Sequence, residues 1–380
     1  MQKYFLPFFL MFSIFIFGQQ KAKIEFIVFT KAIADTEFIT IAGNISELGN
    51  WDASKVTLNK INDTTYSRSF ELKVGDNVEF KITKGSWDKE ALDSDGSVPQ
   101  NTIFNIFSDT SIIIKISGWN DQFKRKSRGQ ITGTVEYIKN LQFNILPPRD
   151  LIIWLPPSYY TEPDKRYPVL YLHDGQNTFD PATSSFGYDW RFDEIADSLI
   201  SIREIDELIM IGIYNTPFRS QEYAPGDTGT TYMNFVVNSV KPLIDSAYRT
   251  FPQRENTFVG GSSMGGLISF MLIWEHPEVF SKALCISPAF KIENLDYISI
   301  VKNYYDQKKP IKIYIDNGGV GLEEKLQPGI DEMIMTLKSK GFQIDQDLLW
   351  HKYEFAQHSE RDWSKRVWRM LKFLFDKNLQ

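Results

Sequence analysis

Short runs of alternating hydrophobic and polar residues fill the chain between residues 21 and 118. Side chains that alternate with a period of two place one face of a β-strand toward a core and the other toward water. This part of the sequence lacks the longer 3.6-residue repeat of apolar positions that is typical of helices. We therefore predict a small antiparallel β-sandwich at 21–118. Its expected strands are IEFIVF (24–29), FITIAG (38–43), YSRSFEL (66–72), VEFKITKG (78–85) and SIIIKIS (111–117).

From residue 131 onward the pattern changes to apolar strands that alternate with helical stretches. Continuous apolar runs of this length are typical of strands buried on both faces of a parallel sheet. We predict an α/β domain at 131–380 with a mostly parallel central sheet, and a polar linker at 119–130. The clearest strands are YPVLYLHD (167–174), ELIMIGIY (207–214), NTFVGGSS (256–263), KALCISP (282–288), KIYIDNG (312–318) and LLWHKYEF (348–355).

The first twenty residues have the features of an export signal. Lys3 precedes an apolar run from Tyr4 to Phe17, and small Gly18 is followed by two glutamines. The run is shorter than the roughly 20 residues that span a membrane as a helix. We predict a signal peptide at 1–20, a secreted or periplasmic protein, and no membrane segment in the mature chain. An uncleaved N-terminal anchor is the alternative.

Composition and charge narrow the class of protein further. Hydrophobic residues make up 42% and charged residues 24%, as in ordinary folded globular proteins. Lys and Arg total 42 against 48 Asp and Glu, so the net charge is −6 and a nucleic-acid partner is not expected. The single cysteine, Cys285, lies in an apolar strand and is predicted to fill the core. No internal disulfide can form.

A Gly-x-Ser-x-Gly pattern at 261–265 carries the strongest chemical signal. It joins the apolar strand NTFVGG to the helical run GLISFMLIW, so Ser263 would sit on a tight strand-to-helix turn. Such a turn presents the hydroxyl to a histidine, while the N–H of Met264 faces a developing oxyanion. A glycine-rich turn with a solvated serine is the alternative. Ser262 breaks the glycine spacing.

The general base can be sought among four histidines. His173 ends a strand, His276 lies where Pro277 ends a helix, and His351 lies within a strand. Only His358 falls in a loop between the last strand and the final helix. In α/β-hydrolases that loop returns to the nucleophile turn, and the chain order is serine, acid, histidine. We therefore expect His358 to be the base.

The acid that orients the histidine should follow the strand KIYIDNG. Asp316, Glu323 and Glu324 are the candidates, and Glu323 is our choice, with the other two left open. The second oxyanion donor should come from the loop after an earlier central strand. There Gly175 permits close backbone approach, so Gln176 is expected to direct its N–H at the same oxygen as Met264.

The segment RSQEYAP (219–225) is expected at the same sheet edge. Arg219 and Tyr223 are predicted to line the substrate pocket, with a purely structural ion pair between Arg219 and Glu222 as the alternative. The sequence contains no HExxH, no paired cysteines and no GxxxxGK. Neither a metal nor a cofactor is therefore expected for the chemistry.

At this point the chain resembles a known family: the esterase D and enterochelin-esterase group of α/β-hydrolases, which includes acetyl-xylan and feruloyl carbohydrate esterases. The resemblance implies an α/β-hydrolase fold and a triad of Ser263, Glu323 and His358. The acid loop is Gly-rich and slightly long, so whether the acid is Glu323 or Glu324 stays open. The motifs that carry the resemblance are LPPSYY (155–160), YLHDGQNTFD (171–180), RSQEYAP, GGSSMGG (260–266), DNGG (316–319) and HSERDW (358–363).

The N-terminal part resembles starch- or glycogen-binding β-sandwiches. The likeness lies in IAGNISELGNW (41–51), in VEFKITKGSWDKE (78–90) and in Asn101. It implies that Trp51 and Trp87 stack on sugar rings and that this part binds polysaccharide. The alternative is that both tryptophans are core residues of a spacer.

Together these features predict a secreted serine esterase. Its substrate would be a carboxylic ester, an acetyl or feruloyl group on a polysaccharide. Two alternatives remain: an esterase of a siderophore such as the enterobactin-like trilactones, and a non-catalytic carbohydrate-binding protein with a relict hydrolase domain.

Overall fold

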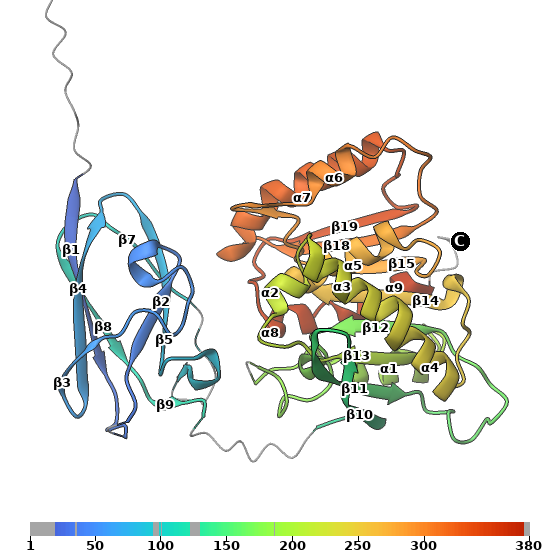
Figure 1. The fold of residues 1–380 in the computed structure, drawn as a ribbon, viewed down its shortest axis with the longest axis horizontal. Coiled ribbons are helices and arrows are strands. Elements are labelled where there is room, and N and C mark those ends of the chain that lie inside the picture. The colour runs from blue at the N-terminus through green and yellow to red at the C-terminus, as the bar shows by residue number, and fades with distance from the viewer. Residues whose placement is uncertain are drawn as a thin grey trace, which may run out of the picture. The chain divides into compact units, whose positions relative to one another are not determined.

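The chain divides into two compact units, residues 1–125 and 126–380 (Figure 1). The computed structural model describes residues 20–34, 36–93, 99, 101–121, 130–185 and 187–375. Residues 1–19 of the predicted signal peptide and 122–129 of the predicted linker lie outside the described residues. Among the described residues, no helix is both long enough and apolar enough to cross a membrane.

The N-terminal unit contains two main β-sheets that share one core. Ile24, Phe26 and Val28 alternate on the buried face of β1 and meet Phe80 and Ile82 of the other sheet. The predicted antiparallel pairing is confirmed, although β1 also pairs in parallel with β8. One sheet has the order β3 (Asn59–Asn62), β4 (Thr65–Lys73), β1 (Lys21–Phe29), β8 (Thr110–Lys115); the other is β2 (Thr40–Gly43), β5 (Asn77–Thr83), β7 (Thr102–Asn105).

This unit extends beyond the predicted boundary at residue 118. A third, two-stranded sheet pairs β6 (Ala91–Leu92) with β9 (Gly118–Trp119), and two short helical turns are η1 (Ser46–Leu48) and η2 (Trp87–Lys89). Trp119 is buried in the core, and its Nε1–H donates to Thr30 Oγ1 at 3.1 Å. The assignment of Trp119 to the linker was therefore wrong. The residues around it in the sequence are polar, so the sequence does not indicate that its ring packs inward.

The C-terminal unit is built on one eight-stranded sheet, and the predicted mostly parallel sheet is confirmed. In this sheet β11 pairs antiparallel with both β10 and β13, and the other described pairings are parallel. The strands at its centre are buried along their whole length, which explains their continuous apolar sequences. The order is β10 (Thr134–Phe143), β11 (Leu146–Leu155), β13 (Ile209–Ile213), β12 (Val169–His173), β14 (Thr257–Ser262), β15 (Lys282–Ile286), β18 (Lys312–Gly318), β19 (Leu348–Tyr353).

Helices cover both faces of this sheet, because alternate strand residues enter two separate cores. Tyr171 packs into one core with helices α3 to α7, whereas Leu170 and Leu172 pack into the other with α1 and α9. The helices are α1 (Phe192–Ser201), α2 (Arg219–Glu222), α3 (Asp227–Phe235), α4 (Lys241–Ala247), α5 (Met264–Glu275), α6 (Ile298–Lys302), α7 (Leu322–Ser339), α8 (Glu360–Ser364) and α9 (Val367–Phe375). Shorter elements are η3 (Gly175–Asn177), the π-turn η4 (Val236–Val240), η5 (Arg254–Asn256), β16 (Lys291–Ile292) and β17 (Leu295–Asp296).

The parallel strands β12, β14, β15 and β18 end at the same edge of the sheet. The chain segments that follow them carry Asp174, Ser263, Ser287 and Glu323 respectively. Ligands and reacting groups in open α/β sheets are bound at this edge, beyond the carboxyl ends of the strands. The candidate site is assembled here.

Candidate functional site

Ser263 lies on a sharp turn between β14 and α5, as predicted. Its backbone has φ 58° and ψ −121°, a conformation that is strained for a residue with a side chain. Two hydrogen bonds hold the turn: Ser263 N–H donates to Ile286 O at 2.8 Å, and Ala289 N–H donates to Ser263 O at 3.2 Å. A Cβ at Gly261 would lie 2.7 Å from Gly265 O, so the glycine there is required.

His358 and the acid Glu323 are brought together by the loop after β19. The distance from His358 Nδ1 to Glu323 Oε1 is 3.2 Å, and the Glu323 carboxyl group is fully buried. Ala356 O accepts hydrogen bonds from the N–H groups of Gly319 and Val320, which anchors this loop beside β18. Since Nδ1 faces a carboxylate, Nδ1 carries the proton and Nε2 is left free to accept one.

The hydroxyl of Ser263 makes no hydrogen bond within the described part of the chain, and neither does His358 Nε2. Both side chains are partly exposed. Catalytic hydrogen bonds of this kind are often long in a ligand-free protein and tighten when substrate binds. Proton transfer from Ser263 to His358 is therefore part of the proposed function.

Ser287, which the sequence did not single out, connects the turn at Ser263 to Glu323. It directly follows Ile286, whose carbonyl accepts from Ser263 N–H, and its own hydroxyl donates to Glu323 Oε1. The indole N–H of Trp363 donates to the same hydroxyl at 3.0 Å, and the Trp363 ring lies edge-on to His358. No recurrent motif marks a serine after a strand, so only the fold reveals this role.

The three candidate acids occupy different environments. Burial alone would raise the pKa of Glu323, but the hydrogen bond and charge of His358, together with Ser287, hold it below its ordinary value. Asp316 points to Tyr314 and Arg366 instead, and burial raises its pKa to about 6 despite the nearby Arg366. Glu324 is exposed on α7. The geometry therefore brings Glu323, and neither alternative, to the histidine.

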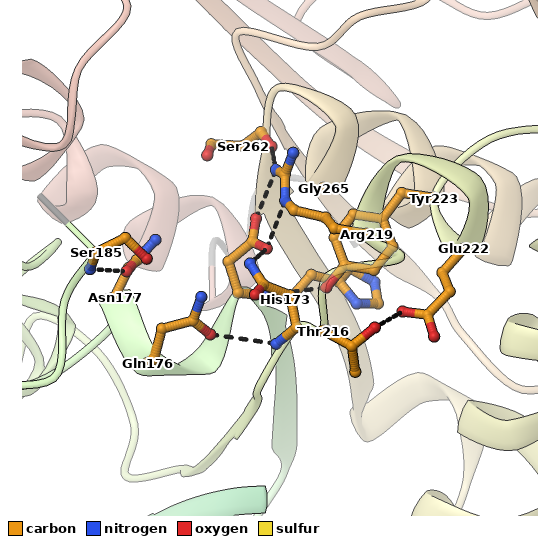
Figure 2. Close-up of polar contacts among 12 residues, drawn as sticks. His173, Gln176, Asn177, Ser185, Thr216, Arg219, Glu222, Tyr223, Ser262 and Gly265 are labelled. Carbon is orange, nitrogen blue, oxygen red and sulfur yellow. Dashed lines mark hydrogen bonds and ion pairs between the residues drawn. The ribbon is translucent and has the colours of Figure 1, made fainter. Parts of the chain in front are cut away.

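The two predicted oxyanion donors each lie in the first turn of a helical element. Met264 is the first residue of α5 and Gln176 lies in η3, so their N–H groups have no partner inside those helices. A Cβ at Gly175 would lie 2.2 Å from the backbone of Gly212, so only glycine allows this loop to approach β13 so closely. The Gln176 side chain accepts from Asn215 N–H at 3.2 Å, which orients the loop (Figure 2).

Arg219 connects the loop that holds Asp174 and the predicted oxyanion donor Gln176, the oxyanion loop, to the turn at Ser263. Its Nε and Nη2 each donate to the Asp174 carboxylate at 2.7 Å, and Nη2 lies 3.4 Å from Ser262 O (Figure 2). The alternative of an ion pair between Arg219 and Glu222 was wrong. Glu222 is paired with Arg149 at 2.6 Å, because α2 turns the two side chains toward different partners.

Tyr223 is fully buried, so it does not line an open pocket as predicted. It lies behind Arg219, 5.1 Å from ring centre to guanidinium, and its hydroxyl accepts from Asp174 N–H. His173 is buried next to it, and its Nδ1 lies 2.8 Å from Tyr232 OH. Burial first, then the charges of Arg219 and Arg149, lowers the pKa of His173 to about 3, so the ring is neutral. The buried Tyr223 and His173 therefore support the loop that carries Asp174 and Gln176.

Trp51 and Trp87 lie together in the N-terminal unit, with ring centroids 6.3 Å apart and ring planes inclined by 40°. Trp87 is 38% exposed and Trp51 is partly exposed. Neither belongs to the hydrophobic core, which is built around Phe26, Phe80 and Trp119. The alternative that they are core residues was wrong, because their rings stand on turns outside the two sheets.

The remaining chemical candidates do not belong to this site. Cys285 is buried in β15, and burial raises the pKa of its thiol, so it is a core side chain as predicted. The one group of acidic side chains in the described residues that converge closely enough for a metal ion is Asp189, Asp193 and Glu194, on the approach to α1.

Two curated proteins resemble the chain at low identity. It is 26% identical over 251 residues to the uncharacterized protein YbbA of Bacillus subtilis, covering 60% of this chain and 94% of that protein. It is 24% identical over 220 residues to an endo-1,4-beta-xylanase/feruloyl esterase of Xylanibacter ruminicola, covering 56% of this chain but only 27% of that protein.

Two solved structures show the same fold at low identity. A ferulic acid esterase superposes with a TM-score of 0.53 and 19% identity, covering 64% of this chain and 98% of that one. The enterobactin esterase FES from Shigella flexneri superposes with a TM-score of 0.55 and 11% identity, covering 89% and 88%. The predicted α/β-hydrolase fold is thereby confirmed.

Family models divide the sequence as the structure divides it. A starch binding domain model matches residues 21–108, within the N-terminal β-unit. A putative esterase model matches residues 147–374, which is more than half of the chain and includes every residue of the site at the sheet edge. The chain therefore belongs to the esterase family.

Proposed function

We propose that the protein is a serine esterase in which Ser263 is the nucleophile, His358 the general base and Glu323 the acid that orients it. The observation that carries this proposal is the hydrogen bond between His358 and the buried Glu323 at the sheet edge where Ser263 occupies its strained turn. Acyl transfer requires a histidine whose outer nitrogen is free to accept the proton of a serine hydroxyl, and the proposal assigns these two roles to His358 and the partly exposed Ser263.

In the first step Ser263 Oγ attacks the carbonyl carbon of the ester, and its proton passes to His358 Nε2. The carbonyl oxygen becomes an oxyanion, which the N–H groups of Met264 and Gln176 stabilise. The ionised Glu323 stabilises the imidazolium. When the tetrahedral intermediate collapses, the C–O bond to the alcohol breaks, and the alcohol leaves with the proton from His358.

The second step releases the acyl group. Water attacks the acyl-Ser263 ester while His358 Nε2 takes one of its protons, and the same oxyanion donors stabilise the second tetrahedral intermediate. Collapse returns the proton to Ser263 Oγ and frees the carboxylic acid. The groups of the protein are thereby restored, and no metal or cofactor takes part in either step.

The substrate we propose is an acetyl or feruloyl ester carried by a polysaccharide. The starch binding domain match and the pair of Trp51 and Trp87 outside the core support binding of a polysaccharide chain. The relative from Xylanibacter ruminicola, named as a xylanase and feruloyl esterase, supports an ester on a glycan. Export by the predicted signal at 1–20 belongs to the same proposal.

A substrate panel tests the proposal. Turnover of p-nitrophenyl acetate, methyl ferulate, acetylated xylan and a catecholate trilactone is compared between the wild type and Ser263→Ala. We expect a loss of about 10⁴-fold or more in kcat for Ser263→Ala, as for other triad serines. Ser262→Ala, one residue away and buried in β14, is the matched control and should stay within a few-fold.

The outcomes separate the candidate functions. Unchanged turnover in Ser263→Ala rejects the nucleophile, and absence of turnover on every ester in the wild type favours a relict hydrolase. A preference for the trilactone over both glycan esters favours the siderophore alternative. Arg219 gives that alternative little support, because its charge is already neutralised by Asp174.

A further inference from the structure

Three carboxylates converge where the chain enters α1, outside the proposed triad. Asp189, Asp193 and Glu194 each offer one oxygen, and these oxygens all lie within 4.8 Å of one another. Asp193 is fully buried and Asp189 nearly so. Buried carboxylates are rare unless a donor or a cation compensates their charge.

Each of these carboxylates uses one oxygen to accept from a protein donor. Arg191 N–H donates to Asp189 Oδ2 at 3.0 Å, and Thr132 N–H donates to Asp193 Oδ2 at 2.7 Å. Arg191 Nε donates to Glu194 Oε1 at 3.2 Å. These bonds fix the orientation of all three groups, in the way that outer hydrogen bonds orient the ligands of a metal.

The other oxygens of the two carboxylates on α1 have no partner. Asp193 Oδ1 and Glu194 Oε2 are both buried, and neither accepts a hydrogen bond from any described residue. A buried polar atom without a partner destabilises the fold, and more so when it is charged. Among the described residues, the one ion pair made by this cluster joins Arg191 to Glu194. A cation between the unpartnered oxygens would compensate their charge.

We propose that Asp189, Asp193 and Glu194 bind a divalent cation, and that the cation is Ca²⁺. Carboxylate oxygens are the ligands that Ca²⁺ and Mg²⁺ prefer. Ca²⁺ takes six to eight oxygen ligands in flexible geometry, whereas Mg²⁺ is usually bound through one or two carboxylates and keeps several waters. Three carboxylates that converge within 4.8 Å of one another therefore fit Ca²⁺ better than Mg²⁺.

The cation would hold a residue that packs on the candidate active site. Trp190 lies between Asp189 and Asp193 in sequence. Its backbone N–H donates to Asn177 O at 2.8 Å, and Asn177 directly follows the predicted oxyanion donor Gln176. Its ring packs edge-on against Trp363, with centroids 5.9 Å apart, and Trp363 in turn contacts His358. The role we assign to Ca²⁺ is structural, and it does not depend on the esterase proposal.

A proton shared between Asp193 and Glu194 is the competing explanation for the two unpartnered oxygens. Burial, with Glu194 beside it, raises the pKa of Asp193 to about 9 when no ion is present. A shared proton requires no metal, so direct binding measurements distinguish the two.

The experiment uses the full chain, stripped with EDTA and then titrated with CaCl₂ or with Tb³⁺, whose luminescence is excited through a nearby tryptophan such as Trp190. We expect 1 mM Ca²⁺ to raise the unfolding temperature by roughly 5–10 °C, as binding at about 100 times Kd does for a unit of this size. Tb³⁺ emission should appear and be displaced by Ca²⁺, and Mg²⁺ should compete more weakly.

Variants assign the response to these residues. Asp193→Asn and the half-buried Glu194→Gln should each abolish both signals, and Asp197→Asn, on the same helix but outside the cluster, should keep them. Glu194→Gln decides the matter if Asp193→Asn does not fold. The proposal is overturned if the stripped wild type shows no shift and no emission at 1 mM ion, or if Glu194→Gln responds as the wild type does.

Discussion

The two candidate sites of this protein are built in opposite ways. In the esterase unit, Glu323 and Asp174 are buried and each accepts several hydrogen bonds. In the N-terminal unit, Trp51 and Trp87 form a pair at the surface, outside the core. Acyl transfer needs charges that are fixed and shielded from water. Stacking on a sugar needs an apolar face that water can leave.

The difference has an energetic consequence. Polar groups in the esterase site share partners, as Ser287 does with Glu323, Trp363 and Arg366, so removal of one leaves the others unpaired. The tryptophans contribute separately, because each ring offers its own surface. We therefore expect substitutions at the sheet edge to have large, non-additive effects on turnover. Substitutions at the aromatic pair should have small, additive effects on glycan affinity.

Among the residues that support the nucleophile, the largest effect is expected for Glu323→Gln, which should lower kcat about 10³- to 10⁴-fold, because an amide cannot hold the histidine in the required tautomer. Asp316→Asn is the matched buried control and should cost less than about 10-fold, since Asp316 faces Arg366 and Tyr314. The measurement is turnover of p-nitrophenyl acetate, with thermal unfolding to verify the fold. A larger loss in Asp316→Asn would reassign the acid.

Arg219→Ala should lower kcat about 100-fold, because the oxyanion loop loses its connection to the nucleophile turn and a misplacement near 1 Å has that cost. The unpaired Asp174 should also lower stability. Arg219→Lys keeps the charge but not the two-pronged bond, so an intermediate kcat is expected. A rise in KM at unchanged kcat would instead mean that Arg219 contacts the substrate.

His173→Phe should make the protein less sensitive to acid. The pKa of His173 is about 3 in the fold against about 6.5 when unfolded, so the unfolded state binds more protons between these values. Stability is therefore lost as pH falls below about 6.5, by about 2 kcal/mol at pH 5 relative to pH 8.

Urea unfolding at pH 5 and pH 8 measures this contribution. Relative to the wild type, His173→Phe should gain about 2 kcal/mol between pH 8 and pH 5. His276→Gln, a change at a partly exposed histidine, is the control. An identical pH dependence in His173→Phe and the wild type would show that the buried ring is not the source.

The smallest effect is expected at the aromatic pair. Trp51→Ala and Trp87→Ala should each weaken binding to soluble starch or xylan about 3- to 10-fold, the worth of one stacking contact. Affinity electrophoresis measures this, with Trp368→Ala as the control at an exposed tryptophan of the other unit. Turnover of p-nitrophenyl acetate should not change. Equal retardation of all three variants and the wild type would remove the binding role.

Much of the fold was predictable because it depends on local pattern. Strands buried on both faces must be apolar along their length, and this revealed β12, β13 and β14. The spacing of Gly261 and Gly265 marked the turn at Ser263, and a close backbone contact excludes a side chain at Gly261. Trp119 was assigned wrongly, since nothing in a polar segment shows that one ring packs inward.

The partners of the charged groups could not be predicted from the sequence. Arg219 and Glu222 are neighbours on a short helix, yet they pair with Asp174 and Arg149, which are 45 and 73 residues away. Ser287 had no motif at all. Its role follows from the position of β15 between β14 and β18, which places it between the nucleophile turn and the acid.

The sequence by itself determined the two-unit organisation, the alternation of strands and helices, and the residue types available for acyl transfer, because these follow from periodicity and from glycine geometry. Only the tertiary structure decided that Glu323 rather than Asp316 meets His358, that Tyr223 is buried, and that three carboxylates converge at the start of α1. The reason is physical: a pairing between distant residues depends on which strand ends lie side by side, and that order is a property of the whole sheet.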